Sequence, residues 1–241
     1  MDGKTVVITG ATRGIGKGFA DHFRARGYKL GLCGRSMEPR TSEGEVHARV
    51  DVTDRNAVQT FAEQVNDTLG TIDLWINNAG VLEPVGPLRS VDTEGFRKNL
   101  DINVMGVLYG CQSYIQHVRQ HGGPGVLINI SSGAAQHGYA GWSAYCAGKA
   151  AVDRMSECIH DEEADIDLRV HAVAPGVIDT DMQELIRGCS PEEFPAVDRF
   201  IQMKKDDSFS SLEFVARTTE ELAFGDHPDR SDVVIRFPPG K

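Results

Sequence analysis

Three residues in the middle of the chain could carry out acid–base chemistry. Tyr145 and Lys149 are four residues apart, so a helix would place them on one face as neighbours. A free phenol has a pKa of about 10, and a nearby ammonium stabilises the phenolate and lowers that pKa. Such a tyrosine could give a proton to a carbonyl oxygen, which Ser132 could hold by a hydrogen bond. An isolated YxxxK is more often an ordinary surface pair, so its meaning depends on the rest of the chain.

A glycine-rich segment near the N-terminus is typical of a phosphate-binding turn. Residues 9–16 read TGATRGIG and lie between a β-branched run and the first segment of helical periodicity. Gly10 can turn the chain with a positive φ, and Gly14 and Gly16 let a ligand approach the backbone closely. The following helix N-terminus would offer free N–H groups to a pyrophosphate. The spacing is G-x3-G-x-G rather than G-x-G-x-x-G, and a plain glycine-rich turn is the alternative.

The end of the second predicted strand indicates which dinucleotide would bind. In dinucleotide folds an acid about 20 residues beyond the glycines binds the ribose 2′-hydroxyl, whereas arginine accommodates a 2′-phosphate. This chain has Gly34 at that position with Arg35 and Ser36 beside it, and Arg13 lies within the glycine segment. A solvated Arg35 is the alternative, but the two arginines together favour NADP(H).

Composition restricts the partners and the compartment. The 241 residues carry a formal net charge of −10 without a basic tract, so we expect no nucleic-acid or anionic membrane partner. No apolar run reaches the roughly 18 residues of a membrane span, and the first residues lack the apolar stretch of a signal peptide. The five cysteines are odd in number and form no CxxC pair, which favours reduced thiols over a disulfide framework or a zinc site. We therefore expect a cytoplasmic protein without a bound metal.

The elements that would position these residues alternate between strand and helix. Short apolar runs predict strands at 5–9, 29–33, 46–50, 72–76, 126–130, 169–174 and 233–237. Helical periodicity and flanking glycines predict helices ending at Gly27, over about 54–70, over 101–121 and over 143–162. The pattern is typical of an α/β protein, here a single doubly wound Rossmann-type domain over 1–241 with a seven-stranded parallel sheet and helices on both faces. Residues 181–211 are polar and weakly periodic, which predicts either a helical lid over a site or a mobile loop.

The motifs, in their order, resemble the short-chain dehydrogenase/reductase family over nearly the whole chain. The landmarks are TGxxxGIG at 9–16, NNAG at 77–80, Asn103, Ser132, YxxxK at 145–149 and PGxxxT at 175–180. NNAG alone could be a turn, but it follows the fourth predicted strand, at the sheet edge where such folds bind ligands. Residues 141–151 and 175–183 are similar to the sepiapterin reductase branch, which includes benzil reductases and contains NADPH-dependent reducers of ketones and vicinal dicarbonyls.

The resemblance implies catalytic roles for four residues. Tyr145 would be the acid/base and Ser132 would hold the substrate oxygen. Lys149 would lower the tyrosine pKa and bind the nicotinamide ribose, and Asn103 would anchor a water in a proton relay. The substrate would contact Ser132, Tyr145 and Gly176.

It also implies a set of residues that contact the cofactor NADP(H). Asp51 and Val52 would contact the adenine, although Asp51, Thr53 or Asp54 could instead cap the next helix. Residues 37–44 are too few for a full helix, which predicts a more open adenine side. The complete set is Gly10, Thr12, Arg13, Gly14, Ile15, Gly16, Arg35, Ser36, Asp51, Val52, Asn78, Ala79, Gly80, Tyr145, Lys149, Pro175, Val177, Ile178 and Thr180.

The predicted function is NADPH-dependent reduction of a small ketone or vicinal diketone by a homodimer or homotetramer. Three alternatives stay open: a sepiapterin-type pterin side-chain reductase, an NADP-dependent alcohol dehydrogenase working oxidatively, and a non-catalytic NADP(H)-binding regulatory protein. Sepiapterin reductases carry an acid in the last strand to hold the pterin. Residues 233–237, VVIRF, have none, and Asp232 is out of place. This departure favours the diketone.

Overall fold

The computed structural model describes residues 3–225 and 232–241, which form one eight-stranded sheet of order β3-β4-β2-β1-β5-β6-β7-β8. The strands are β1 Thr5–Thr9, β2 Lys29–Gly34, β3 Arg40–Ser42, β4 Glu45–Arg49, β5 Ile72–Asn77, β6 Gly125–Ile130, β7 Leu168–Ala174 and β8 Val234–Arg236. Seven of them match the predicted strands to within one residue at each end, and these seven pair in parallel. The additional strand β3 pairs antiparallel to β4 at the sheet edge. Its three exposed residues are too few to give a hydrophobic pattern.

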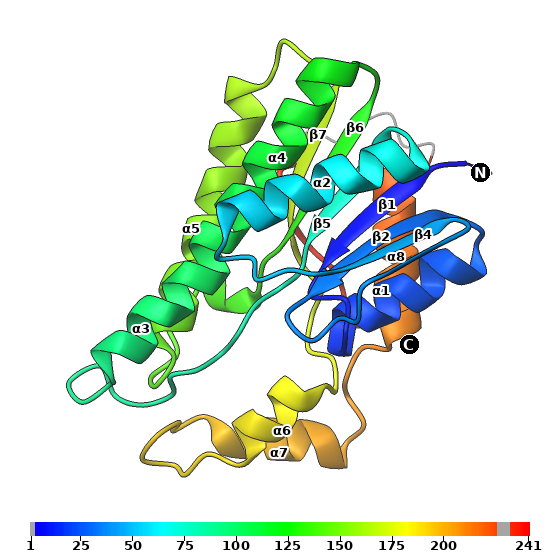
Figure 1. Ribbon diagram of the computed structural model, residues 1–241. Coiled ribbons are helices and arrows are strands. Elements are labelled where there is room, and N and C mark those ends of the chain that lie inside the picture. Colours follow the sequence, from blue (N-terminus) through cyan, green and yellow to red (C-terminus); the bar gives the residue numbers. More distant parts are fainter. Residues whose placement is uncertain (1–2, 226–231) are drawn as a thin grey trace.

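Helices cover both faces of the sheet, as the doubly wound prediction requires. Apolar side chains of α1 and α8 pack on one face, among them Phe19 and Val215. Those of α2, α4 and α5 pack on the other, among them Phe61, Tyr114 and Val152 (Figure 1). The helices are α1 Gly14–Ala25, α2 Arg55–Leu69, α3 Thr93–Leu100, α4 Gly106–His121, α5 Ser143–Glu162, α6 Asp181–Arg187, α7 Val197–Lys205 and α8 Leu212–Phe224.

The helix predicted over 101–121 begins earlier, at Thr93, and contains a short π-helical turn between two α-helical parts. Helix α3 runs directly into a π-helical turn at Asp101–Met105, which continues as α4. A π turn carries one more residue than an α turn, so it rotates the side chains within it relative to both neighbouring helices. Asn103 lies in this turn and is fully buried. Hydrophobic periodicity alone does not reveal such a local change.

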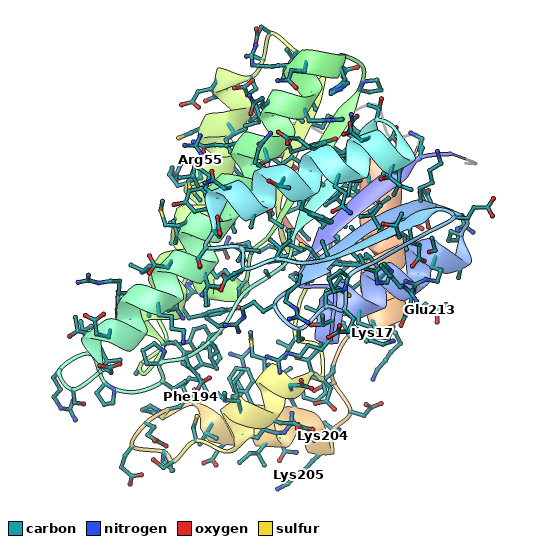
Figure 2. All side chains as sticks on the ribbon, in the orientation of Figure 1. Lys17, Arg55, Phe194, Lys204, Lys205 and Glu213 are labelled. Carbon is teal, nitrogen blue, oxygen red and sulfur yellow. The ribbon has the colours of Figure 1, made fainter. Side chains whose placement is uncertain are left out.

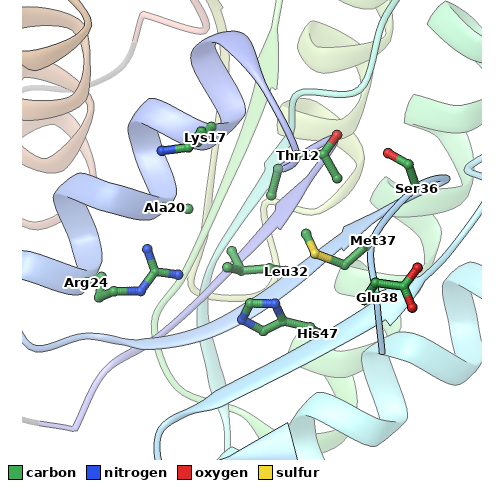
Figure 3. Close-up of a pocket in the computed structure, with 10 residues that line it drawn as sticks. Thr12, Lys17, Ala20, Arg24, Leu32, Ser36, Met37, Glu38 and His47 are labelled. Atoms are coloured by element: carbon green, nitrogen blue, oxygen red, sulfur yellow. The ribbon is translucent and has the colours of Figure 1, made fainter. Parts of the chain in front are cut away.

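The connection between β2 and β4 is a short hairpin rather than a helix, in agreement with the expectation of a more open side. A cavity of about 380 Å³ opens there between α1 and the two strands (Figure 3), and Thr12, Ser36 and His47 contribute to its lining. The strand face that a helix would have covered carries polar groups, with Glu45 accepting hydrogen bonds from Arg24 at 2.5 Å and bonded to His47 at 2.6 Å. Charged and polar side chains suit an uncovered strand face because they can stay in contact with water.

Residues 181–211 form α6, α7 and their connections, and they lie apart from the three layers at the end toward which β1 points (Figure 1). Phe194, between the two helices, is fully buried, and Ile186 and Phe200 are buried as well. Figure 2 shows Phe194 on the side facing the rest of the molecule and Lys205 on the side away from it. Lys204 pairs with Asp179, in the loop that leads from β7 to α6. The segment therefore contains two helices, and its role as a lid stays a prediction.

Candidate active site

Six of the loops that carry predicted site residues follow the carboxyl ends of six adjacent parallel strands. Gly10 follows β1, Arg35 follows β2 and Asp51 lies just beyond β4. On the other half of the sheet, Asn78 follows β5, Ser132 lies just beyond β6, and Pro175 follows β7. The strand order reverses between β1 and β5, and doubly wound sheets bind ligands at such a switch point. The topology thus brings residues from distant parts of the sequence to one edge.

The turn after β1 and the loop after β5 are tied together at this switch point. The Asn78 side-chain amide donates to the carbonyl oxygens of Thr9 at 2.9 Å and Gly10 at 3.1 Å. A Cβ on Gly10, whose φ is +66°, would lie 2.8 Å from the Ala79 Cα. A Cβ on Gly16 would lie 2.3 Å from the Gly10 carbonyl oxygen. Gly16 therefore allows two parts of the glycine-rich turn to pack closely against each other. Its predicted role in letting a ligand approach the backbone stays a prediction.

The N-terminus of α1 has the features that a pyrophosphate requires. Its N-cap residue, Arg13, has extended backbone and makes no side-chain cap bond to the first turn. Gly14 has a φ of +54°, and a Cβ there would meet only the Thr180 side chain, at 3.6 Å and beyond. The backbone N–H groups of this turn can therefore bind an anion, which the helix dipole also favours.

Residues 34–36, at the end of β2, carry positive charge and no acid. Gly34 is buried, and a Cβ there would lie 3.0 Å from the Thr12 methyl group, so a larger residue would displace Thr12. Arg35 and Ser36 follow it and are exposed. The Arg13 guanidinium is also exposed and pairs with Asp181 at 3.1 Å, a contact that links the glycine turn to the start of α6. Both arginines are accessible to a phosphate at this edge.

Tyr145 is buried on the first turn of α5 and faces Ser132. Burial raises the pKa of its phenol, and a hydrogen bond with Ser132 lowers it. The sequence analysis expected a lowered pKa, but in this structure desolvation outweighs the favourable contact. A phenol of ordinary pKa, about 10, is already protonated at neutral pH, and burial acts in the same direction. The protonated phenol is the form that can act as an acid.

Lys149 lies one helical turn beyond Tyr145 and is also buried, with 4% of its surface exposed. Its Nζ donates to the Ile130 carbonyl oxygen at 2.7 Å and lies 5.7 Å from the centre of the Tyr145 ring. Burial lowers its pKa to about 8, against the opposing effect of the Asp153 carboxylate. A Cβ on Gly80 would lie 3.7 Å from this Nζ and 3.0 Å from the Asn103 Oδ1, so Gly80 keeps the space above both groups open.

Asn103 is held rigidly by the loop after β5. Its Oδ1 accepts from the Val81 N–H at 2.9 Å, and its Nδ2 donates to the Val81 carbonyl oxygen at 2.8 Å. The same Nδ2 donates to the Asn99 Oδ1 at 2.8 Å. The Oδ1 still has a second lone pair with which it can accept from a water.

The remaining predicted residues border the same edge on either side. Asp51 is exposed and accepts from Thr53, while Asp54 caps α2 through Asn56 and Ala57, which decides between the alternative caps. Val52 is buried, 2.7 Å from the position of a Cβ on Gly106. In the loop after β7, Pro175 and Ile178 are buried, Gly176 has a φ of +87°, and Val177 accepts from the Ser210 N–H. Thr180 is the N-cap residue of α6.

Comparison with known proteins decides the family. The short chain dehydrogenase family model matches residues 4–188. The chain belongs to the short-chain dehydrogenase family. A benzil reductase ((S)-benzoin forming) of Bacillus cereus is 31% identical over 231 residues, which cover 90% of this chain and 92% of that protein. Among solved structures, KRED1-Pglu has a TM-score of 0.87 at 30% identity, with 96% of this chain and 100% of that one covered. ElxO with NADP bound has a TM-score of 0.82 at 25% identity, with 98% and 97% covered.

As a short-chain dehydrogenase with benzil reductase relatives, the protein is an oxidoreductase of the carbonyl reductase type that acts on small molecules. Within residues 3–225 and 232–241, no helix is long and apolar enough to cross a membrane. In the same described part, no three His, Cys, Asp or Glu side chains group as metal ligands would.

Several residues of this short-chain dehydrogenase site were not identified from the sequence. Asn99 is fully buried, and its amide donates to the carbonyl oxygens of Val81, Leu82 and Glu83, so it holds the loop that positions Asn103. Asp153 lies one turn beyond Lys149 and contacts Ser131. Both lie four residues from a family landmark, and stepping along the helix face in fours could have found them. Asp181 and Arg236 carry no comparable local signal.

Proposed function

We propose that this protein is an NADPH-dependent reductase of small ketones or vicinal diketones, with Tyr145 as the proton donor. The observation that carries the proposal is the pairing of a protonated, buried Tyr145 with Ser132, one helical turn from Lys149. Residues 1–241 would act as one domain in which residues 181–211, with α6 and α7, are the lid over the substrate.

The residues present fit NADPH: an uncapped α1 N-terminus for the pyrophosphate, and Arg13 and Arg35 for the 2′-phosphate. When bound, NADPH supplies the hydride for the carbonyl carbon. Ser132 would hold the carbonyl oxygen by a hydrogen bond, and Tyr145 would give that oxygen its phenolic proton. The Lys149 ammonium would stabilise the phenolate left behind, and Asn103 would hold a water that returns a proton.

The benzil reductase of Bacillus cereus supports the reductive direction over alcohol oxidation. The Tyr145 phenol itself serves both directions, as the proton donor in reduction and, once ionised, as the base in oxidation. A protein that only binds NADP(H) would require no buried proton donor at all.

The surroundings of Tyr145 favour an apolar diketone over a pterin. Trp142, Phe194 and Phe200 pack with Tyr145 in one apolar cluster. The charged side chain that β8 contributes near Ser132 is Arg236, and Asp232 is exposed, beyond the opposite end of that strand. A pterin presents N–H donors, and a guanidinium has only donors to offer in return. The benzil reductase of Bacillus cereus supports the same substrate class.

The relative with NADP bound supports NADP(H) as the cofactor. We also propose a cytoplasmic homodimer or homotetramer, in which the five cysteines, all free in this structure, stay reduced.

NADPH oxidation with benzil, a small aliphatic diketone and sepiapterin tests the function. We expect catalytic efficiency with a diketone to exceed that with sepiapterin by about ten-fold or more, because a buried unmet donor costs about 1–3 kcal/mol. Tyr145→Phe serves as the control for background oxidation. A clear preference for sepiapterin would contradict the substrate assignment. NADPH binding without turnover of any ketone would favour the regulatory alternative, and turnover only of alcohols with NADP⁺ would favour the oxidative one.

A further inference from the structure

A closed ring of contacts joins Ser132 and its neighbour Ser131 to the side chains of Asp153 and Arg236. The Ser131 hydroxyl donates to Asp153 Oδ1, and Asp153 Oδ2 lies 3.5 Å from the Arg236 Nη2. The ring closes where Arg236 Nη1 donates to the carbonyl oxygen of Ser132 at 3.2 Å. Since Ser131 and Ser132 are adjacent, two side chains from α5 and β8 hold the dipeptide that carries the catalytic hydroxyl.

The same carboxylate lies on the helix face that carries the proton donor. Tyr145, Lys149 and Asp153 follow one another at intervals of four residues along α5. Lys149 donates to Ile130, the residue that precedes Ser131, so lysine and carboxylate bind successive residues at the end of β6. Both side chains therefore set the path of the chain into Ser132.

Asp153 and Lys149 also interact electrostatically. Asp153 is the carboxylate that raises the pKa of Lys149 against the lowering effect of burial. Burial has the largest effect on Asp153 itself and raises the pKa of its carboxyl group, and Glu157 on the same helix raises it further. Ser131, Arg236 and Lys149 lower that pKa without reversing the direction, so these three partners are what favours the charged form.

We propose that Asp153 is a positioning residue for the proposed reduction: with Arg236 it fixes Ser132 in place, and its carboxylate is the counter-charge of the Lys149 ammonium. The inference rests on the proposed function, because both effects act through residues of that reaction. Neither role requires Asp153 to touch the substrate.

Two substitutions at Asp153 separate the two roles. Asp153→Asn keeps an oxygen that accepts from Ser131 but removes the charge. Lys149 then loses its proton at lower pH, so the alkaline limb of the kcat/KM profile moves toward acid by about one pH unit. Asp153→Glu keeps the charge but displaces the contact with Ser131. It leaves the limb in place and lowers kcat by about ten-fold or more, as small misplacements of reacting groups do.

The matched control is Asp161→Asn, which makes the same charge change on an exposed residue two turns further along α5. It should leave both the limb and kcat as in the parent protein. If the alkaline limb of the kcat/KM profile falls at the same pH in Asp153→Asn as in Asp161→Asn, the counter-charge role is overturned.

Ser131→Ala tests the positioning role should either Asp153 variant fail to fold, since it removes a single hydroxyl. We expect a lower kcat, an NADPH KM within about two-fold of the parent, and an unmoved limb. A kcat equal to that of the parent would overturn the positioning role. Failure of the parent protein to reduce any ketone would instead contradict the proposed function, before any variant is compared.

Discussion

The rings of Trp142 and Phe194 stack face to face, with centroids 4.3 Å apart and 6° between their planes. Trp142 is the N-cap residue of α5, three positions before Tyr145, and Phe194 lies between α6 and α7. Trp142 also meets the Tyr145 ring edge to face at 6.0 Å. The position of the segment 181–211 is therefore coupled to that of Tyr145, the proposed proton donor, through these aromatic contacts.

Phe194→Ala should loosen this segment. Removing a fully buried phenylalanine costs about 3–5 kcal/mol, and much of that loss falls on the packing of α6 and α7 against the site. We expect faster proteolysis within 181–211 and a substrate KM raised by about ten-fold. Lys205→Ala, on the exposed side of the same segment, is the control. Unchanged proteolysis and unchanged KM in Phe194→Ala would contradict the lid assignment.

Arg35→Ala should weaken NADPH binding and leave NADH binding nearly unchanged. A charge-assisted hydrogen bond is worth about 1.5–3 kcal/mol, which corresponds to about ten-fold or more in Kd. Fluorescence titration with both cofactors measures the difference. Equal efficiency of the parent enzyme with NADH and NADPH would contradict the assignment of the cofactor.

Asp181→Asn should tighten NADPH binding. Asp181 holds the Arg13 guanidinium in an exposed ion pair, and such pairs contribute about 0–1 kcal/mol. A 2′-phosphate that competes for Arg13 would gain up to about five-fold in affinity once the carboxylate is neutral. Arg13→Ala should have the opposite effect. An NADPH Kd unchanged in both variants would mean that Arg13 does not contact the phosphate.

Tyr145→Phe should abolish turnover and leave NADPH binding close to normal. The ring still packs against Trp142, while the only group lost is the hydroxyl that gives the proton. Steady-state rates and NADPH titration on the same preparation provide the comparison. Activity above a few per cent of the parent would show that another residue is the acid.

Lys149→Met should abolish activity and yet stabilise the fold at neutral pH. Burial lowers the Lys149 pKa from 10.5 to about 8, which disfavours the ammonium in the folded state by about 3 kcal/mol. The methionine avoids that cost, less the contribution of the lost hydrogen bond to Ile130. The unfolded chain binds more protons between pH 8 and 10.5, so parent stability rises through that window.

Denaturant unfolding of both proteins at several pH values checks this prediction. The advantage of Lys149→Met should be complete below pH 8 and disappear as the pH approaches 10.5. An advantage that does not change with pH would have another cause.

Much of this molecule follows from local sequence. Strand bounds came out within one residue, because buried parallel strands are short continuous apolar runs between turns. Helix α5 has the predicted bounds. The motifs TGxxxGIG, NNAG, Ser132 and PGxxxT each come just at or after a strand end, where a parallel sheet gathers them at one edge. Which residues belong to the candidate site could therefore be predicted from the sequence, because each motif is short and can be recognised without knowledge of distant contacts.

What the tertiary structure decided depends on residues far apart in the chain. Arg13 meets Asp181 across 168 positions, and Arg236 meets Ser132 across 104. Nothing in the local pattern around any of them indicates the partner. The direction of the Tyr145 pKa also depended on burial, because desolvation is set by everything that packs around the phenol, while spacing revealed only the nearby lysine. Periodicity reports which face of an element is buried, and contacts between elements arise only once the chain has folded.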